Sequence, residues 1–377
     1  MKQKSISILK NLRHPNGLFS ASKKNVSTGY NMAWIRDNVY ECLGLEGFED
    51  ELITQTYQTM LDIFLKHEQK IDNAILNPPS NKQEYLHARY FPHNLEESRE
   101  EWGNKQNDMI GAFLFKISDL TQKGFKIVRD RNDIRILQKL VKYLDSISYY
   151  RDPDNGMWEE NEEIHSSSVG ACVAGLKKLR ETKFIMDEKE ATVTTCELSA
   201  TGGTDGIFNK KSKTNYKKIK NKNTNKKTTK IYVPEELIQK GMDTLEVLLP
   251  RESVTKRADL ALLSLIWPYE IATKEQAKQI LKNVEEDLVR EKGVIRYIGD
   301  KYYNENGEAE WTMGFPWLAI IHKKIRNRKK YKFYLGRSLS CQNKLMEMPE
   351  LYYANSRIHN QNSPLGWAQS LLIAALE

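Results

Sequence analysis

The sequence has few cysteines, no long apolar run and no glycine-rich phosphate loop. Its four cysteines lie far apart and form no Cys-x-x-Cys pair, which argues against a zinc site or a disulfide framework. No segment approaches the roughly 20 apolar residues of a membrane span, and residues 1–10 are basic without the apolar stretch of a signal peptide. Neither Gly-x-Gly-x-x-Gly nor Gly-Lys-Ser/Thr occurs. We therefore expect a soluble, cytoplasmic protein without a metal or another cofactor.

The basic character of the chain is confined to one segment. The net charge is +8, but residues 210–230 hold ten lysines and no acid, which leaves −2 for the rest of the chain. Because residues 205–230 are polar and almost free of core residues, we interpret them as a disordered or solvated insertion in a single domain spanning residues 1–377. A non-specific contact with a polyanion is the alternative. Specific nucleic-acid binding is not expected.

Apolar residues recur at helical spacing along most of the chain, and convincing strand alternation is scarce. Helix and long polar-aromatic loop alternate some ten or more times, which predicts an all-α bundle or toroid with the loops gathered at one end. Periodicity alone does not choose between the two. The clearest helices are expected over residues 50–67, 109–120, 134–147, 237–249, 274–290, 311–322 and 365–372.

Two acidic loops stand out. An Asp-Asn-Gly turn leads into Trp158, Glu159 and Glu160, and three serines then offer N-caps for a helix. A second acid, Glu350, lies in a Pro-Glu-Leu-Tyr stretch near the C-terminus. A solvated acidic loop is the ordinary interpretation of the first. Two acids accompanied by aromatic residues and an Arg-Asp pair, Arg36-Asp37, are however what hydrolysis of a glycosidic bond requires.

Histidines and tryptophans have competing interpretations. The spacing of His87 and His93 fits no helical ligand pair and no cysteine is near them, so a metal site is not expected there. Trp267 and Trp317 lie at helix ends among apolar neighbours and are expected in the core. The tryptophans of the polar loops are expected in a pocket instead: Trp34, Trp102 and Trp158.

Several loop motifs, taken in order, resemble the glucoamylase family, glycoside hydrolase family 15. This family also takes in certain trehalases, glucodextranases and the α subunit of phosphorylase kinase. The resemblance runs from about Pro15 to the C-terminus. The motifs are Trp34-Ile35-Arg36-Asp37, Trp102-Gly103 with Gln106 and Asp108, Gly156-Met157-Trp158-Glu159, Arg296-Tyr297 before Tyr302-Tyr303, and Pro349-Glu350-Leu351-Tyr352 before Pro364-Leu365 with Trp367.

The resemblance implies an (α/α)6 barrel of six inner and six outer helices, with a pocket for the non-reducing end of an α-glucan or oligosaccharide. It implies that Glu159 is the general acid and Glu350 the general base of an inverting hydrolase. On general grounds, inversion needs two carboxyl groups roughly 6.5–9.5 Å apart. The acid also needs a raised pKa, which we expect the neighbouring Glu160 and the apolar wall of Trp158 to cause. The substrate-binding residues that it implies are Trp34, Arg36, Asp37, Trp102, Asp108, Trp158, Glu160 and Arg296.

Three alternatives remain beside this interpretation. A trehalase or glucodextranase would keep the fold and change the linkage that is cleaved. A non-catalytic glucan-binding regulatory protein would resemble the phosphorylase kinase subunit. A polyanion-binding protein would use the lysine-rich segment. Many prokaryotic relatives carry an N-terminal β-sandwich, for which the short leader of this sequence leaves no room.

Overall fold

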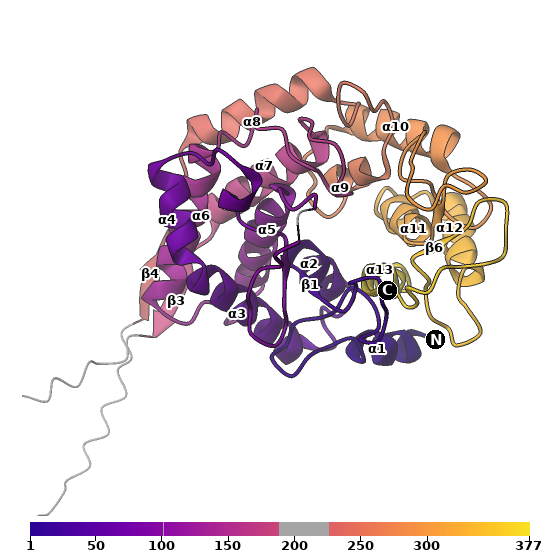
Figure 1. Ribbon diagram of the computed structural model, residues 1–377, viewed down its shortest axis with the longest axis horizontal. Helices are drawn as coiled ribbons and strands as arrows, with labels where there is room; N and C mark the ends of the chain where they lie inside the picture. The colour runs from indigo at the N-terminus through magenta and orange to yellow at the C-terminus, as the bar shows by residue number, and fades with distance from the viewer. Residues whose placement is uncertain (101, 188–225) are drawn as a thin grey trace, which may run out of the picture.

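The computed structural model describes residues 1–100, 102–187 and 226–377, and six of its helices form a closed inner ring. Each helix of the ring packs against the next, and the last packs against the first (Figure 1). The ring consists of α2 (Ile35–Leu43), α5 (Asp108–Gln122), α7 (Ser166–Glu181), α9 (Leu263–Ile266), α11 (Gly314–Lys324) and α13 (Gly366–Ala375).

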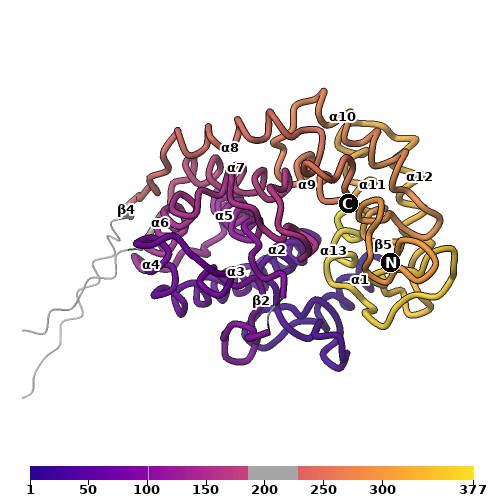
Figure 2. Tube along the Cα trace, turned by 45° about the horizontal axis from the view of Figure 1, so that its top comes forward, coloured from indigo at the N-terminus to yellow at the C-terminus, as the bar shows by residue number. Residues whose placement is uncertain are grey.

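Outer helices surround this ring and alternate with the inner ones along the chain. They are α1 (Lys2–Lys10), α3 (Asp50–Lys66), α6 (Arg131–Ser146), α8 (Glu235–Leu248), α10 (Lys274–Asn283) and α12 (Arg328–Ser340). A further helix, α4 (Glu68–Leu76), packs on α6, and α1 packs beside α13, so both ends of the chain lie on the same side of the ring (Figure 2). The (α/α)6 barrel that the sequence analysis predicted is confirmed.

Burial differs between the two layers as the sequence pattern requires. All nine residues of α2 are buried, because an inner helix has neighbours on every side. Helices α5 and α7 approach very closely: a Cβ on Gly111 would lie 2.3 Å from the backbone of Ala171, so only glycine fits there. The outer helix α6 is amphipathic and begins at an N-cap, Asp130, whose carboxylate accepts the backbone N–H groups of Asn132 and Asp133.

Short strands, which the helical periodicity did not indicate, tie the loops together in pairs. Strand β1 (Ala33–Trp34) pairs with β2 (Arg89–Tyr90), and β5 (Glu310–Trp311) pairs with β6 (Leu351–Tyr352). Most of the expected insertion lies outside the described residues. Its last part forms β4 (Lys226–Thr229), which pairs with β3 (Phe184–Asp187).

Two expected helices have different bounds in the structure. The helix expected over 311–322 begins only at Gly314, because the backbone of Trp311 pairs with Val294 and Leu351 in neighbouring loops. The helix expected over 274–290 leaves α-helical geometry at Asn283 and ends in a π-helical turn, Val284–Leu288. Two short 3-10 turns complete the elements, Lys82–Glu84 and Leu260–Leu262.

Two further features of the described residues concern the cysteines and the lengths of the helices. Cys42, Cys172 and Cys341 are buried free thiols. Within the described part of the chain, no helix combines the length and apolar character needed to cross a bilayer.

Candidate active site

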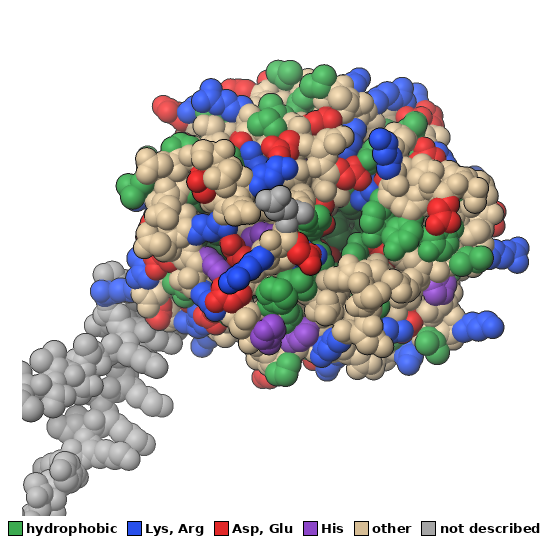
Figure 3. All heavy atoms as spheres, viewed as in Figure 1, with side chains coloured by type: hydrophobic (Ala, Val, Ile, Leu, Met, Phe, Trp, Pro, Cys, Tyr) green, Lys and Arg blue, Asp and Glu red, His purple; other side chains and the backbone are tan. Residues whose placement is uncertain are grey.

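A cavity of about 270 Å³ lies where the amino ends of the inner helices converge. Figure 3 shows a hollow near the centre of this face, with hydrophobic side chains, drawn in green, inside it. Aromatic and charged residues dominate the lining: Tyr30, Trp34, Trp102, Trp158, Tyr302, Trp311 and Trp367, with Arg36, Asp37, Glu159, Glu160 and Arg296. Of the ten site residues expected from sequence, eight therefore line one cavity, and Asp108 and Glu350 do not.

Arg36 connects the wall of the cavity to Glu159. It lies in the first turn of α2, and its Nη2 is 3.3 Å from Glu159 Oε1. Its Nη1 donates to Gln106 Oε1 at 2.7 Å and lies 3.2 Å from Asp108 Oδ2. Asp108 is buried at the start of α5, behind the guanidinium. Asp108 thus contacts Arg36 and lies outside the lining of the cavity.

Asp37 is the second acid on this wall, beside Arg36 on α2. Only 7% of the residue is exposed, and burial raises its pKa to about 6. The Arg36 cation opposes this shift, and the Asp108 carboxylate adds to it. Asp37 therefore changes charge in the weakly acidic range.

A strained turn presents Glu159. Asp154 fixes the start of the turn, because its carboxylate accepts the backbone N–H groups of Asn107 (2.8 Å) and Gly156 (3.1 Å). Glu159 has φ +64°, a left-handed conformation uncommon for a residue with a side chain. The backbone of Gly103 lies directly against it, since a Cβ there would come within 2.3 Å of the Glu159 carbonyl oxygen. Such strain persists only where the surroundings enforce it.

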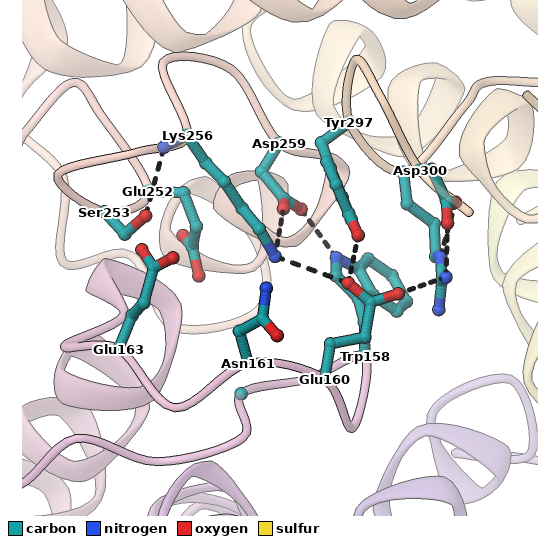
Figure 4. Close-up of polar contacts among 12 residues, drawn as sticks. Trp158, Glu160, Asn161, Glu163, Glu252, Ser253, Lys256, Asp259, Tyr297 and Asp300 are labelled. Carbon is teal, nitrogen blue, oxygen red and sulfur yellow. Dashed lines mark hydrogen bonds and ion pairs between the residues drawn. The ribbon is translucent and has the colours of Figure 1, made fainter. Parts of the chain in front are cut away.

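Trp158 and Glu160, the two neighbours of Glu159, are held by hydrogen bonds to a distant part of the chain, residues 259–297. Trp158 Nε1 donates to Asp259 Oδ1 at 2.7 Å. Glu160 accepts from the guanidinium of Arg296 at 2.5 Å and from the hydroxyl of Tyr297 (Figure 4). Arg296 is also paired with Asp300, at 2.6 and 2.7 Å. Glu159 therefore pairs with Arg36, whereas Glu160 pairs with Arg296 and Tyr297.

The pKa of Glu159 is raised to about 7. Burial is the main cause; Arg36 and Arg89 lower the pKa, and the neighbouring Asp37 raises it. The raised pKa agrees with the expectation, and burial is the kind of cause expected from the apolar ring of Trp158, but the repulsion comes from Asp37 where Glu160 was expected. Glu160 does not supply the repulsion, because its charge is paired with Arg296.

Glu350 is fully buried and lies behind two tyrosines of the cavity wall. Its Oε1 accepts from the hydroxyl of Tyr30 at 2.6 Å and lies 3.5 Å from that of Tyr302. Its Oε2 accepts from Asn362 at 2.8 Å and from Asn360. Burial raises the pKa of Glu350, while these hydrogen bonds lower it by stabilising the charged form. The Tyr30 hydroxyl connects this carboxylate to the cavity.

Sequence reasoning gave no role to several residues that complete the site. Tyr30 packs its ring 5.6 Å from that of Trp34, and its place in the same polar-aromatic loop is the signal that could have identified it. Trp311 ends strand β5, Trp367 lies in the first turn of α13, and both add rings to the wall beside Trp158. Asn360 lies in a loop without periodicity, so only the folded chain shows that it binds Glu350.

The structure also places His87 and the two tryptophans that were expected in the core, Trp267 and Trp317. His87 is buried against the ring of Trp102, and its Nδ1 accepts the backbone N–H of Arg89 at 3.0 Å. No group of three or more potential metal-ligating side chains occurs in the described residues. Trp317 is buried in the core as expected. Trp267 lines a second cavity of about 700 Å³ at the carboxyl ends of the inner helices, away from both acids.

A closed ring of six inner and six outer helices defines an (α/α)6 barrel, and an aromatic and acidic cavity lies at one end of it. The sequence model of glycosyl hydrolases family 15 matches residues 3–374, and the chain belongs to this family.

Known structures share the fold of this chain, and curated proteins are similar to it in sequence. A glycosidase variant in complex with glucose has a TM-score of 0.75 at 15% identity, over 99% of this chain and 94% of that one. Glucoamylase from Saccharomycopsis fibuligera has a TM-score of 0.64 at 12% identity, over 100% and 93%. The probable phosphorylase b kinase regulatory subunit alpha of Drosophila melanogaster is 23% identical over 89% of this chain. The chain spans only 28% of the length of that relative.

Proposed function

We propose that this protein is an inverting glycoside hydrolase that releases glucose from the non-reducing ends of α-glucans and maltooligosaccharides, as glucan 1,4-α-glucosidases do. The observation that carries the proposal is the state of Glu159. It is a glutamate with a pKa of about 7, held in the wall of an aromatic cavity beside a buried arginine. A carboxylic acid that keeps its proton near neutrality is what the leaving oxygen of a glycosidic bond requires.

Glu350 is the proposed general base. Three neutral donors, Tyr30, Asn360 and Asn362, stabilise its charged form, so it can accept a proton from water. Because it lies behind Tyr30, the water to be activated has to bind beside the Tyr30 hydroxyl. The different surroundings of the two carboxyl groups give them different proposed roles: Glu159 is protonated and Glu350 is ionised.

The remaining wall residues are proposed to bind sugar. A guanidinium and a carboxylate, Arg36 and Asp37, offer charged partners to the hydroxyls of a terminal sugar, while Trp34, Trp102 and Trp158 offer flat apolar faces. Glu160 and Arg296 would bind the next sugar. The volume of about 270 Å³ is below that of drug-sized pockets and suits a single sugar unit, which favours attack at chain ends.

One set of assays tests this proposal. Purified protein is incubated with maltose, maltotriose, dextran and trehalose, and released glucose is measured. We expect activity on maltose and maltotriose that falls by orders of magnitude in Glu159→Gln and Glu350→Gln, with binding of the oligosaccharide largely kept. Glu162→Gln is the matched control, because Glu162 is an exposed acid of the same loop, paired with Lys82. Full activity in Glu350→Gln would remove this residue from the base role. Cleavage of trehalose or dextran alone would favour the related trehalase or glucodextranase function.

A second candidate function is non-catalytic glucan binding with a regulatory role. The similarity to a protein named a phosphorylase b kinase regulatory subunit supports it, over 89% of this chain. Binding of maltotriose without release of glucose would favour this candidate.

We also propose a reducing compartment, the cytoplasm, because the described cysteines are buried free thiols.

A further inference from the structure

Lys256 lies at the back of the wall that carries the two neighbours of Glu159. Its ammonium is 3.7 Å from Glu160 Oε2 and 3.9 Å from Asp259 Oδ2 (Figure 4). The same ammonium lies 3.9 Å from the centroid of the Tyr297 ring, a cation–π distance. The side chain is only 9% exposed. A largely buried cation thus faces two carboxylates and one aromatic ring at once.

Asp259 transmits this contact to Trp158. Its Oδ1 accepts both the indole N–H of Trp158 at 2.7 Å and the backbone N–H of Ala261 at 2.8 Å. Its Oδ2 is buried and accepts no hydrogen bond within the described chain; the ammonium of Lys256 faces this oxygen, while the Glu252 carboxylate opposes the charge of Asp259. Loss of the Lys256 cation would destabilise the charged form of the carboxylate to which Trp158 donates.

The backbone around Lys256 is itself fixed. Its N–H donates to Ser253 Oγ at 3.1 Å, and its carbonyl accepts the N–H of Glu252 at 3.0 Å. The lysine therefore approaches the Glu159 turn from a braced loop. The turn needs such a brace, because the left-handed backbone at Glu159 would otherwise relax.

We propose that Lys256 is a positioning residue that locks the turn carrying the general acid, by tying Glu160 directly and Trp158 through Asp259. This inference rests on the proposed function of Glu159. Lys256 does not line the cavity, so it acts on the reaction through the residues that flank Glu159.

The test compares Lys256→Met and Lys256→Arg with a control, Arg257→Met, at the next position. Arg257 is exposed and pairs with Asp287, away from the cavity. Each variant is assayed on maltose and on α-glucosyl fluoride, whose fluoride leaves with little help from an acid. A misplaced acid should slow only the first substrate. We expect Lys256→Met to lower kcat on maltose by about tenfold or more, since small misplacements cost up to about 100-fold, and to change KM by less than about threefold.

On α-glucosyl fluoride, Lys256→Met should stay within about threefold of the wild type. Lys256→Arg, which keeps the charge, should recover most of the kcat on maltose, and Arg257→Met should match the wild type. Unchanged kcat on maltose in Lys256→Met would overturn the proposal. An equal loss on both substrates would also overturn it, because general damage does not distinguish leaving groups. If Lys256→Met does not fold, Lys256→Gln takes its place under the same criteria.

Amide hydrogen exchange separates this inference from the proposed function. If the wild type cleaves none of the glucosides, the proposed function fails, but the lock on the turn can still be measured. The turn contains amide hydrogen bonds from Glu160 N to Asn155 O (3.0 Å) and from Glu159 N to Gly156 O (3.4 Å). We expect peptides covering 156–164 to exchange at least about tenfold faster in Lys256→Met and unchanged in Arg257→Met. Equal exchange in both would refute the lock.

Discussion

Replacing Tyr30 by phenylalanine removes one hydroxyl, which contacts both the proposed base Glu350 and the hydroxyl of Tyr302. That hydroxyl donates to Glu350 Oε1 at 2.6 Å and lowers the pKa of Glu350 by stabilising its charged form. A hydrogen bond to a charged group contributes about 1.5–3 kcal/mol. Because the base must be ionised to act, losing this bond raises the pKa of Glu350 and moves the acidic limb of the pH profile of kcat/KM upward by about 1 to 2 pH units.

The same free energy sets the size of the rate effect. Below the acidic limb, the ionised fraction of Glu350, and with it kcat/KM, should fall by about 10- to 150-fold, while the rate on the plateau changes much less. The assay is glucose release from maltotriose between pH 3 and 8. Tyr353→Phe is the control, because the ring of Tyr353 packs against Tyr303 and its hydroxyl is not among the described donors to Glu350. An acidic limb that stays in place in Tyr30→Phe, or moves equally in the control, would refute the reasoning.

Three further outcomes follow from the same geometry. Glu159→Gln should abolish the alkaline limb near pH 7 and slow maltose far more than α-glucosyl fluoride; equal losses on both would exclude an acid role. Gly103→Ala places a methyl group 2.3 Å from the carbonyl oxygen of Glu159, so we expect a loss of about 1–3 kcal/mol in the free energy of unfolding, measured by urea denaturation, together with lower activity. Deleting residues 210–225 should leave glucose release intact while weakening any salt-sensitive binding to heparin, and a deletion that abolishes glucose release would show that these residues serve the site.

The helices were predictable because burial leaves a 3.6-residue period in the sequence. Segments such as Asp50–Lys66 show that period, and their observed bounds agree with the expected ones within a few residues. The strand at Trp311 was not predictable, since its pairing partners are 17 and 40 residues away and leave no local pattern. Closure into a ring was implied only by the family resemblance, because periodicity does not record which helices are neighbours.

Residue types and motifs identified most residues of the cavity wall, but not how deeply each side chain is buried. Glu350 has a recognisable motif, yet its position behind Tyr30 depends on loops far apart in the chain. The high pKa of Glu159 was expected from the apolar Trp158 and from Glu160; burial does raise it, but the acid that adds to the shift is Asp37. The local sequence identifies charged residues that could belong to the site. Which of them form ion pairs depends on the fold.

The anomer of the first glucose released from maltotriose tests the central claim most directly. The claim is that a protonated Glu159 and an ionised Glu350 act on opposite sides of one glycosidic bond, with water as the nucleophile. Proton NMR during the first minutes of hydrolysis, before mutarotation, distinguishes the two anomers. We expect β-glucose. Initial release of α-glucose, or no release at all by the folded protein, would contradict the account.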